Sequence, residues 1–208
     1  MERHLIAILR GISVSEVKDI ASCLIHAGIN QIEIPLNSPN ALKSIELLCH
    51  HFCGQAILGA GTVLSTKEVN DVYQLGVNLI VSPNCDPSVI KETKLLGMKS
   101  IPGVFTPSEQ LNAVKNGADA LKIFPASMMG AKDFRAIKAV LPSCIKTYAV
   151  GGISENDFSE WFQSGVTGFG LGSTLYSPGS TVREVSNKAE RVVKRYEELL
   201  IKDFDYRT

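Results

Sequence analysis

The sequence lacks an excess of charge of either sign: its 208 residues contain 21 Lys and Arg and 21 Asp and Glu, for a formal net charge of zero. This balance gives no indication of binding to nucleic acid or to an anionic membrane, although a local site for an anionic ligand stays open. No run approaches the ~20 apolar residues that a transmembrane helix needs. The apolar stretch 5–9 is too short for the core of a signal peptide. These absences predict a cytoplasmic protein.

Cysteine is scarce and dispersed. The chain has five cysteines, an odd number, and it is long enough to form a core without cross-links, so free thiols in a reducing compartment are expected. Cys49 and Cys53 are four residues apart at a predicted helix end, beside His50 and His51. Zinc could use such ligands, but no second ligand pair follows at the usual spacing. The sequence therefore predicts no metal, with these thiols as small apolar side chains on a helix face.

Glycine recurs where a helical pattern stops, a few residues before a short apolar segment. Glycine ends a helix readily because it adopts the left-handed conformation without strain. These glycines are Gly28, Gly76, Gly97, Gly117 and Gly165. The pattern is a βα repeat, and its predicted strands are 5–10, 31–36, 56–61, 79–83, 99–104, 120–125, 145–150 and 168–173.

Strands that alternate with helices through short connections predict a parallel sheet, and eight such units favour a closed barrel over an open sheet. We therefore expect an α/β protein with a (β/α)8 TIM barrel as a single domain over residues 1–208, ending in a long helix at about 181–202 and a loosely held tail at 203–208. Helix starts are predicted at Ser13, Ser65, Asp86, Thr106 and Ser154.

Lys122 is the most informative residue because it lies inside the predicted buried strand 120–125. Burial of an ammonium group is unfavourable unless the charge is paired or lost, and a lysine of lowered pKa attacks carbonyl carbons to form a Schiff base. Glu33 has the matching third position of strand 31–36, and alternate barrel strands supply one layer of inward side chains. The pair is expected to meet inside the barrel. The alternatives are a structural ion pair and, for Lys122 alone, an edge-strand lysine that prevents aggregation.

Other candidate residues follow the carboxyl ends of strands, where barrel enzymes have their active sites. Gly151 and Gly152 follow the seventh strand and residues 170–173 end the eighth, the two places where such barrels commonly bind phosphate, and Ser173 can add a hydroxyl donor. Arg10 ends the first strand and suits a carboxylate or phosphate. Turns also need glycine, and an arginine can simply form an ion pair across the rim, so these two structural alternatives stay open.

Four motifs, taken together and in order, resemble the class I 2-dehydro-3-deoxy-6-phosphogluconate and 6-phosphogalactonate aldolases. They are Ile-Ala-Ile-Leu-Arg-Gly at 6–11, Glu-Ile-Pro-Leu-Asn-Ser at 33–38, Gly-Ala-Gly-Thr-Val-Leu at 59–64 and Leu-Lys-Ile-Phe-Pro at 121–125. The resemblance implies a (β/α)8 barrel, usually a homotrimer, that needs no metal or other cofactor. Its partner would be a phosphorylated keto-sugar acid, with neither nucleic acid nor membrane involved.

The resemblance also implies roles for the site residues. Lys122 would form the Schiff base, and Glu33 would be the general acid and base. Arg10 and Thr62 would bind the pyruvate-derived end of the substrate, and Pro83 would shape the pocket. The phosphate would be held by Gly151, Gly152, Gly172 and Ser173.

Two positions favour the 6-phosphogalactonate branch of this family. Asn37 stands where the gluconate branch typically has an arginine, and Val150 stands where that branch tends to have a threonine. The expected reaction is cleavage of 2-dehydro-3-deoxy-6-phospho-D-galactonate to pyruvate and D-glyceraldehyde 3-phosphate, with the gluconate substrate as the alternative. A phosphosugar isomerase or epimerase, which would not require a buried lysine, and a non-catalytic phosphate sensor are the other hypotheses.

Overall fold

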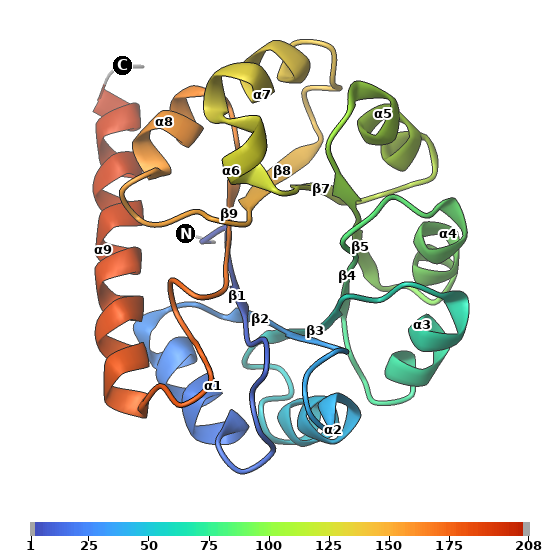
Figure 1. Ribbon diagram of the computed structural model, residues 1–208, viewed down its shortest axis with the longest axis vertical. Helices are drawn as coiled ribbons and strands as arrows, with labels where there is room; N and C mark the ends of the chain where they lie inside the picture. The colour runs from blue at the N-terminus through green and yellow to red at the C-terminus, as the bar shows by residue number, and fades with distance from the viewer. Residues whose placement is uncertain (1–2, 206–208) are drawn as a thin grey trace.

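The computed structural model describes the backbone of residues 3–205 and the side chains of residues 3–201. A ring of strands is surrounded by helices (Figure 1). The strands are β1 (Leu5–Ile8), β2 (Gln31–Pro35), β3 (Ile57–Gly61), β4 (Leu79–Val81), β5 (Lys99–Ile101), β6 (Gly103–Val104), β7 (Ala120–Ile123), β8 (Lys146–Val150) and β9 (Gly168–Leu171). The helices are α1 (Val17–Ala27), α2 (Ala41–His51), α3 (Thr66–Tyr73), α4 (Pro87–Leu95), α5 (Pro107–Lys115), α6 (Ala126–Met129), α7 (Ala131–Lys138), α8 (Phe158–Gln163) and α9 (Val182–Asp205).

The nine strands form one parallel sheet in the order β5-β4-β3-β2-β1-β9-β8-β7-β6. The two ends of this order, β5 and β6, are separated in the chain only by Pro102, which has no N–H to give to a neighbouring strand. The segment is still bonded toward β7, because Asp119 N–H donates to the Ser100 carbonyl at 3.0 Å and Lys122 N–H donates to the Pro102 carbonyl at 2.9 Å. The sheet is therefore a nearly closed α/β barrel, with nine strand segments where eight strands were predicted.

Three of the five predicted helix starts are confirmed by side-chain caps. Ser65 and Thr106 each form a reciprocal capping box with the glutamate three residues later. Asp86, which is followed by Pro87, accepts a hydrogen bond from the Ser88 N–H. The predicted glycine stops are confirmed as well, since all five glycines have a positive φ between 75° and 96°.

The predicted starts at Ser13 and Ser154 are three residues too early, because the N-caps of α1 and α8 are Glu16 and Asp157. In each case the serine begins a turn, with backbone bonds from Glu16 N–H to the Ser13 carbonyl and from Asp157 N–H to the Ser154 carbonyl. The helices α1 and α8 follow these turns. The tail predicted at 203–208 differs also, since 203–205 belong to α9 and 206–208 lie outside the described residues.

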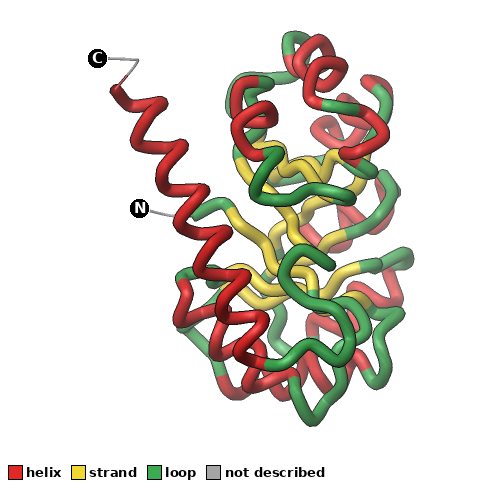
Figure 2. Tube along the Cα trace, turned by 60° about the vertical axis from the view of Figure 1, so that its left-hand side comes forward, coloured by secondary structure: helices red, strands yellow, loops and turns green. Residues whose placement is uncertain are grey.

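The core has two parts, one on each side of the sheet. A large cluster fills the space between the strands and the helices, including α9, which packs beside α1 and extends past the barrel (Figures 1 and 2). A smaller cluster fills the barrel interior: Ile6, Ile8, Leu79, Val81, Ile101, Ala120, Tyr148 and Val150. Strand residues alternate between these clusters, so Lys122, two positions after the inward Ala120, also faces the interior. Across the described ranges, no helix is both long enough and apolar enough to cross a bilayer.

Candidate active site

Lys122 on β7 and Glu33 on β2 are both buried, as the sequence predicted. Their exposed fractions are 4% and 1%. The Lys122 ammonium lies 4.5 Å from the centroid of the Phe124 ring, a contact that favours a cation and that sequence reasoning missed. Phe124 follows Lys122 by two residues, so the alternation of side chains along a strand is the signal that could have identified it.

Burial is the main influence on both ionisable groups. It raises the pKa of Glu33 from its ordinary 4.5 to about 7, against the opposing effect of the positive charges of Lys122 and Arg10. Burial also lowers the pKa of Lys122, and Arg10 lowers it further, while Glu33 acts in the opposite direction. Burial therefore increases the share of the neutral amine, the form that attacks carbonyl carbons, relative to an exposed lysine.

The pair is not a structural ion pair in direct contact. Among the described side chains, no ion pair within 4.0 Å joins Glu33 to Lys122. Oε2 of Glu33 is buried and has no hydrogen-bond partner there. A buried carboxyl without a fixed partner is unfavourable to keep for stability alone, whereas it can accept and return a proton during a reaction.

A pocket of about 130 Å³ opens above Lys122 at the carboxyl ends of the strands. Its lining includes seven of the predicted site residues: Arg10, Lys122, Val150, Gly151, Gly152, Gly172 and Ser173. Phe124, Thr174, Ile8 and Ile153 also line it and had not been predicted as site residues, and Gly170 belongs to the stretch 170–173 that was expected to bind phosphate. The structure thus brings the lysine, one arginine and both glycine loops together around one small cavity.

The two glycine loops are joined to each other. Thr174 Oγ1 donates to the Ile153 carbonyl at 2.7 Å, which links the loop after β9 to the loop after β8. Gly151 and Gly152 have φ values of 94° and 73°, so the turn itself requires glycine there. A Cβ placed on Gly172 would meet no other atom within 4 Å, and Ser173 is exposed. The loops can therefore approach an anion closely and offer it a hydroxyl donor.

Four predicted residues lie outside the lining of this pocket. Glu33 lies within the barrel, and Asn37 acts on the pocket through Arg10, because its Oδ1 accepts from Arg10 Nη1 at 2.6 Å. Thr62 follows β3 with a φ of 57°, a left-handed conformation that is unusual for a β-branched residue and is common at functional sites. Pro83 is half-buried just beyond β4. All four still belong to β2, β3 or β4 or to the segment that follows their carboxyl ends.

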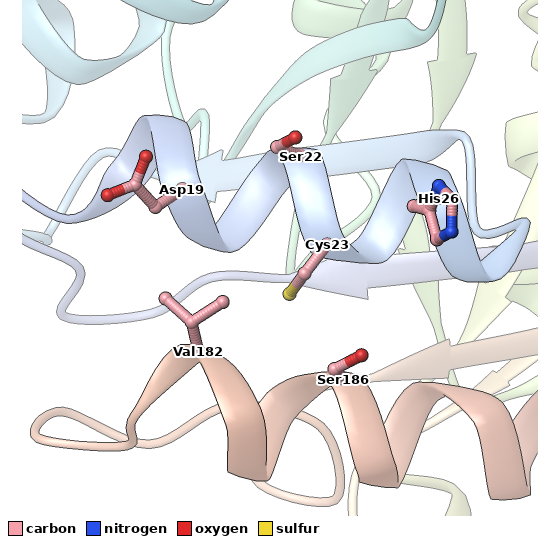
Figure 3. A pocket seen from close by; sticks show the side chains of 6 residues that line it. All are labelled: Asp19, Ser22, Cys23, His26, Val182 and Ser186. Carbon is pink, nitrogen blue, oxygen red and sulfur yellow. The ribbon is translucent and has the colours of Figure 1, made fainter.

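Two larger pockets contain no such combination. A groove of about 480 Å³ between α1 and α9 is lined by Asp19, Ser22, Cys23, His26, Val182 and Ser186 (Figure 3). Its one thiol, Cys23, has a pKa raised to about 11 by burial, so little reactive thiolate forms. The second, of about 410 Å³, includes Cys49 and Cys53, and burial with Cys53 nearby raises the Cys49 pKa to about 11. Over residues 3–201, no cluster of three or more His, Cys, Asp or Glu could hold a metal.

The raised pKa of Glu33 makes a prediction about stability. The folded state holds this proton more tightly than the unfolded chain, so stability is lost as the pH rises from about 4.5 to about 7. Glu33→Gln cannot ionise. Across that interval its free energy of unfolding should therefore rise by about 3 kcal/mol relative to that of the wild type. Urea unfolding at pH 4.5 and 8 measures the change, with Glu46→Gln, at an exposed position of α2, as the control. An equal pH dependence in Glu33→Gln and the wild type would contradict the burial of this carboxyl.

Comparison with known proteins identifies relatives over nearly the whole chain. Residues 1–192 match the family model described as KDPG and KHG aldolase. A protein of Rhizobium meliloti (strain 1021), named "Probable 2-dehydro-3-deoxy-6-phosphogalactonate aldolase", is 45% identical over 95% of this chain and 93% of its own length. A solved structure described as "Native KDPGal structure" superposes with a TM-score of 0.94 at 41% identity, covering 96% of this chain and 97% of that one.

A more distant solved structure bears on the chemistry. It is a KDPG aldolase from Legionella pneumophila with pyruvate captured at low pH as a covalent carbinolamine intermediate. Its TM-score is 0.83 at 26% identity, and the match covers 92% of this chain and 94% of that one. A carbinolamine forms when an amine adds to a carbonyl carbon, the reaction to which a buried neutral lysine is suited.

Proposed function

Because this chain belongs to the KDPG and KHG aldolase family, we propose that it is a class I aldolase, a carbon–carbon lyase. The substrate would be 2-dehydro-3-deoxy-6-phospho-D-galactonate, and the products would be pyruvate and D-glyceraldehyde 3-phosphate. The observation that carries this proposal is the buried Lys122, which faces a pocket lined by two glycine loops and whose pKa is lowered by burial. The galactonate-branch relatives at about 40% identity or more support the choice of substrate.

The first half of the reaction attaches the substrate to the protein. The neutral Lys122 amine attacks the C2 ketone and forms a carbinolamine, which loses water to give an imine. Glu33, whose pKa burial raises to about 7, can donate a proton to the departing hydroxyl and can take one from the nitrogen, directly or through water. The resulting protonated imine withdraws electrons from C3.

The second half breaks the C3–C4 bond. Glu33 as a carboxylate takes the proton of the C4 hydroxyl, the C4 oxygen forms the aldehyde, and the electron pair of the C3–C4 bond moves to the iminium and gives an enamine. Glyceraldehyde 3-phosphate leaves. Protonation of the enamine at C3 and hydrolysis of the imine release pyruvate and restore the Lys122 amine. The iminium itself is the electron acceptor of these steps.

The two ends of the substrate are assigned to different residues of the site. We assign the phosphate to Gly151, Gly152, Gly172 and Ser173, because these loops are linked and open to an anion. The remaining contacts that we propose are the carboxylate with Arg10 and Thr62, positioning of Arg10 by Asn37, shaping of the pocket by Pro83, and discrimination at C4 by Val150.

Borohydride trapping tests the covalent step. Incubation with pyruvate and borohydride should reduce the imine and add a pyruvate-derived mass to one peptide, the one that contains Lys122. The same incubation without pyruvate is the control. No adduct, or an adduct on a peptide that lacks Lys122, would exclude the mechanism and favour a phosphosugar isomerase or epimerase, which needs no covalent lysine.

Comparison of the two C4 epimers tests the substrate. The wild type should prefer the galactonate substrate over the gluconate substrate by about 10-fold or more in kcat/KM. Val150 packs beside Gly170, whose added Cβ would lie 2.7 Å from a Val150 methyl, so the similarly shaped threonine fits this space. Val150→Thr should shift the ratio toward gluconate because it adds a hydroxyl beside the pocket. A wild-type preference for gluconate would overturn the branch assignment.

We further propose that the whole chain forms one (β/α)8 domain, in which 99–104 is a single strand interrupted at Pro102. The hydrogen bonds from 99–104 to both of its neighbours support this count. A homotrimer is proposed on the family resemblance alone.

A further inference from the structure

Gly61, the last residue of β3, lies directly against the carboxyl group of Glu33. A Cβ placed on Gly61 would be 1.7 Å from Glu33 Oε2, 2.3 Å from Cδ and 2.6 Å from Oε1. Nonbonded atoms do not approach so closely, so any side chain at position 61 would occupy the space that the carboxyl group now fills. The three nearest atoms all belong to this one group.

Backbone conformation does not explain this glycine. Gly61 is absent from the described residues with positive φ, and it pairs within the sheet with Pro35 on β2 and with Val81 on β4. Another residue type could therefore adopt its backbone conformation. The requirement at this position is space, which distinguishes Gly61 from the glycines of the turns after the strands.

The slot left by Gly61 matters because little else holds the carboxyl group. Glu33 Oε2 has no hydrogen-bond partner among the described residues, and Glu33 makes no ion pair there. Its neighbouring charges, Lys122 and Arg10, act at a distance. The close approach to Gly61 is therefore the direct contact of this carboxyl group that the structure shows.

We propose that Gly61 is a positioning residue for the aldolase reaction: the missing side chain at the end of β3 forms the slot that holds the Glu33 carboxyl group within the barrel. The inference rests on the proposed function for its catalytic meaning, but the slot itself does not. Gly61→Ala should move the carboxyl group away from its place, lower kcat by about 100-fold or more, and leave KM within about 3-fold because the phosphate loops are untouched.

A double-mutant cycle separates this role from a general effect on the fold. In a Glu33→Ala background the added methyl of Gly61→Ala meets no carboxyl group, so kcat and unfolding midpoint should change little on the second substitution. Gly59→Ala is the matched control, since it lies on the same face of β3 but its Cβ would meet the Leu79 carbonyl at 2.7 Å. Its effect should be equal with and without Glu33. Equal effects of Gly61→Ala in the two backgrounds would overturn the proposal.

Failure to fold is also informative in this design. If Gly61→Ala does not fold but Gly61→Ala with Glu33→Ala does, the clash is with Glu33, as proposed. If neither variant folds, Gly61 serves the barrel independently of Glu33, and the proposal is wrong.

A measurement without substrate keeps this inference distinct from the proposed function. The wild type should lose stability between pH 4.5 and 7 because of Glu33, whose charged neighbours are Lys122 and Arg10. In Gly61→Ala the expelled carboxyl group should reach water, and this loss should largely disappear. A wild type that cleaves neither epimer would disprove the aldolase and leave this result intact, whereas an unchanged pH dependence in Gly61→Ala would disprove the slot.

Discussion

Lys122→Met should abolish aldol cleavage and, at the same time, make the folded protein more stable. The thioether cannot form an imine, so kcat/KM should fall by about 10⁴-fold or more for both C4 epimers. Methionine has a similar length and no charge to desolvate, and residues such as Ile8 and Val150 already make the surrounding interior apolar. Function and stability should therefore change in opposite directions at this position.

The gain in stability should depend on pH, and its sign follows from the direction of the pKa shift. Burial lowers the pKa of Lys122 in the folded state, so the unfolded chain binds this proton more tightly and the wild type loses stability as the pH falls. At about pH 6 Glu33 is mostly protonated, so removal of the positive charge leaves little unpaired negative charge. At pH 6 the free energy of unfolding of Lys122→Met should exceed that of the wild type by about 1 kcal/mol or more.

Urea unfolding at pH 6 and a coupled assay for pyruvate release check the two parts of this prediction. Lys99→Met is the matched control, because Lys99 is exposed on β5. It should keep its activity and change stability by no more than about 0.5 kcal/mol. Substantial cleavage by Lys122→Met would show that another group supplies the electron acceptor.

Glu33→Gln should lower kcat by about 10²- to 10⁴-fold with little change in KM. The amide is nearly isosteric with the carboxyl group and fits the same slot, but it cannot accept the C4 hydroxyl proton. Lys122 remains in place, so borohydride should still trap pyruvate, more slowly. A variant that cleaves at the wild-type rate would remove Glu33 from the mechanism.

The pH dependence of kcat/KM gives a second measure of Glu33. The wild-type value should fall as the pH drops through about 7, because the proton-accepting form of Glu33 is lost there. Protonation of Lys122, whose pKa burial lowers, acts in the same direction. Glu33→Gln should lose the part of this dependence that belongs to the carboxyl group. Glu46→Gln, at its exposed position on α2, should keep the wild-type profile.

The parts of the fold that follow from the spacing of the βα repeat and from local residue chemistry could be predicted from the sequence. The spacing of Gly76, Gly97 and Gly117 indicated the βα repeat, and the capping boxes of Ser65 and Thr106 located two helix starts. The matching third positions of Lys122 and Glu33 in their predicted strands indicated that both lie inside the barrel. Each of these signals is local, within one element and its ends.

The parts that could not be predicted depend on contacts between elements. Pro102 interrupts a strand only because a neighbouring strand would use its missing N–H, and the slot at Gly61 exists only because Glu33 on β2 turns toward β3. Ser13 looked like a helix cap because a turn and a helix start use the same residue types. A glycine that serves a neighbour's side chain cannot be distinguished, in one sequence, from a glycine that serves its own backbone.

The pairing of β1 with β9 has a consequence for how the chain folds. Most strand pairs close short loops, such as Ala120 with Lys146, which are 26 positions apart as 146 − 120. Leu5 and Phe169 are 164 positions apart as 169 − 5. Closing the longer loop has a larger entropic cost, so this seam should form late, after the local βα units on either side of it. We therefore expect the pairing of β1 with β9 to limit the folding rate. The strand β1 also pairs with β2, which carries Glu33.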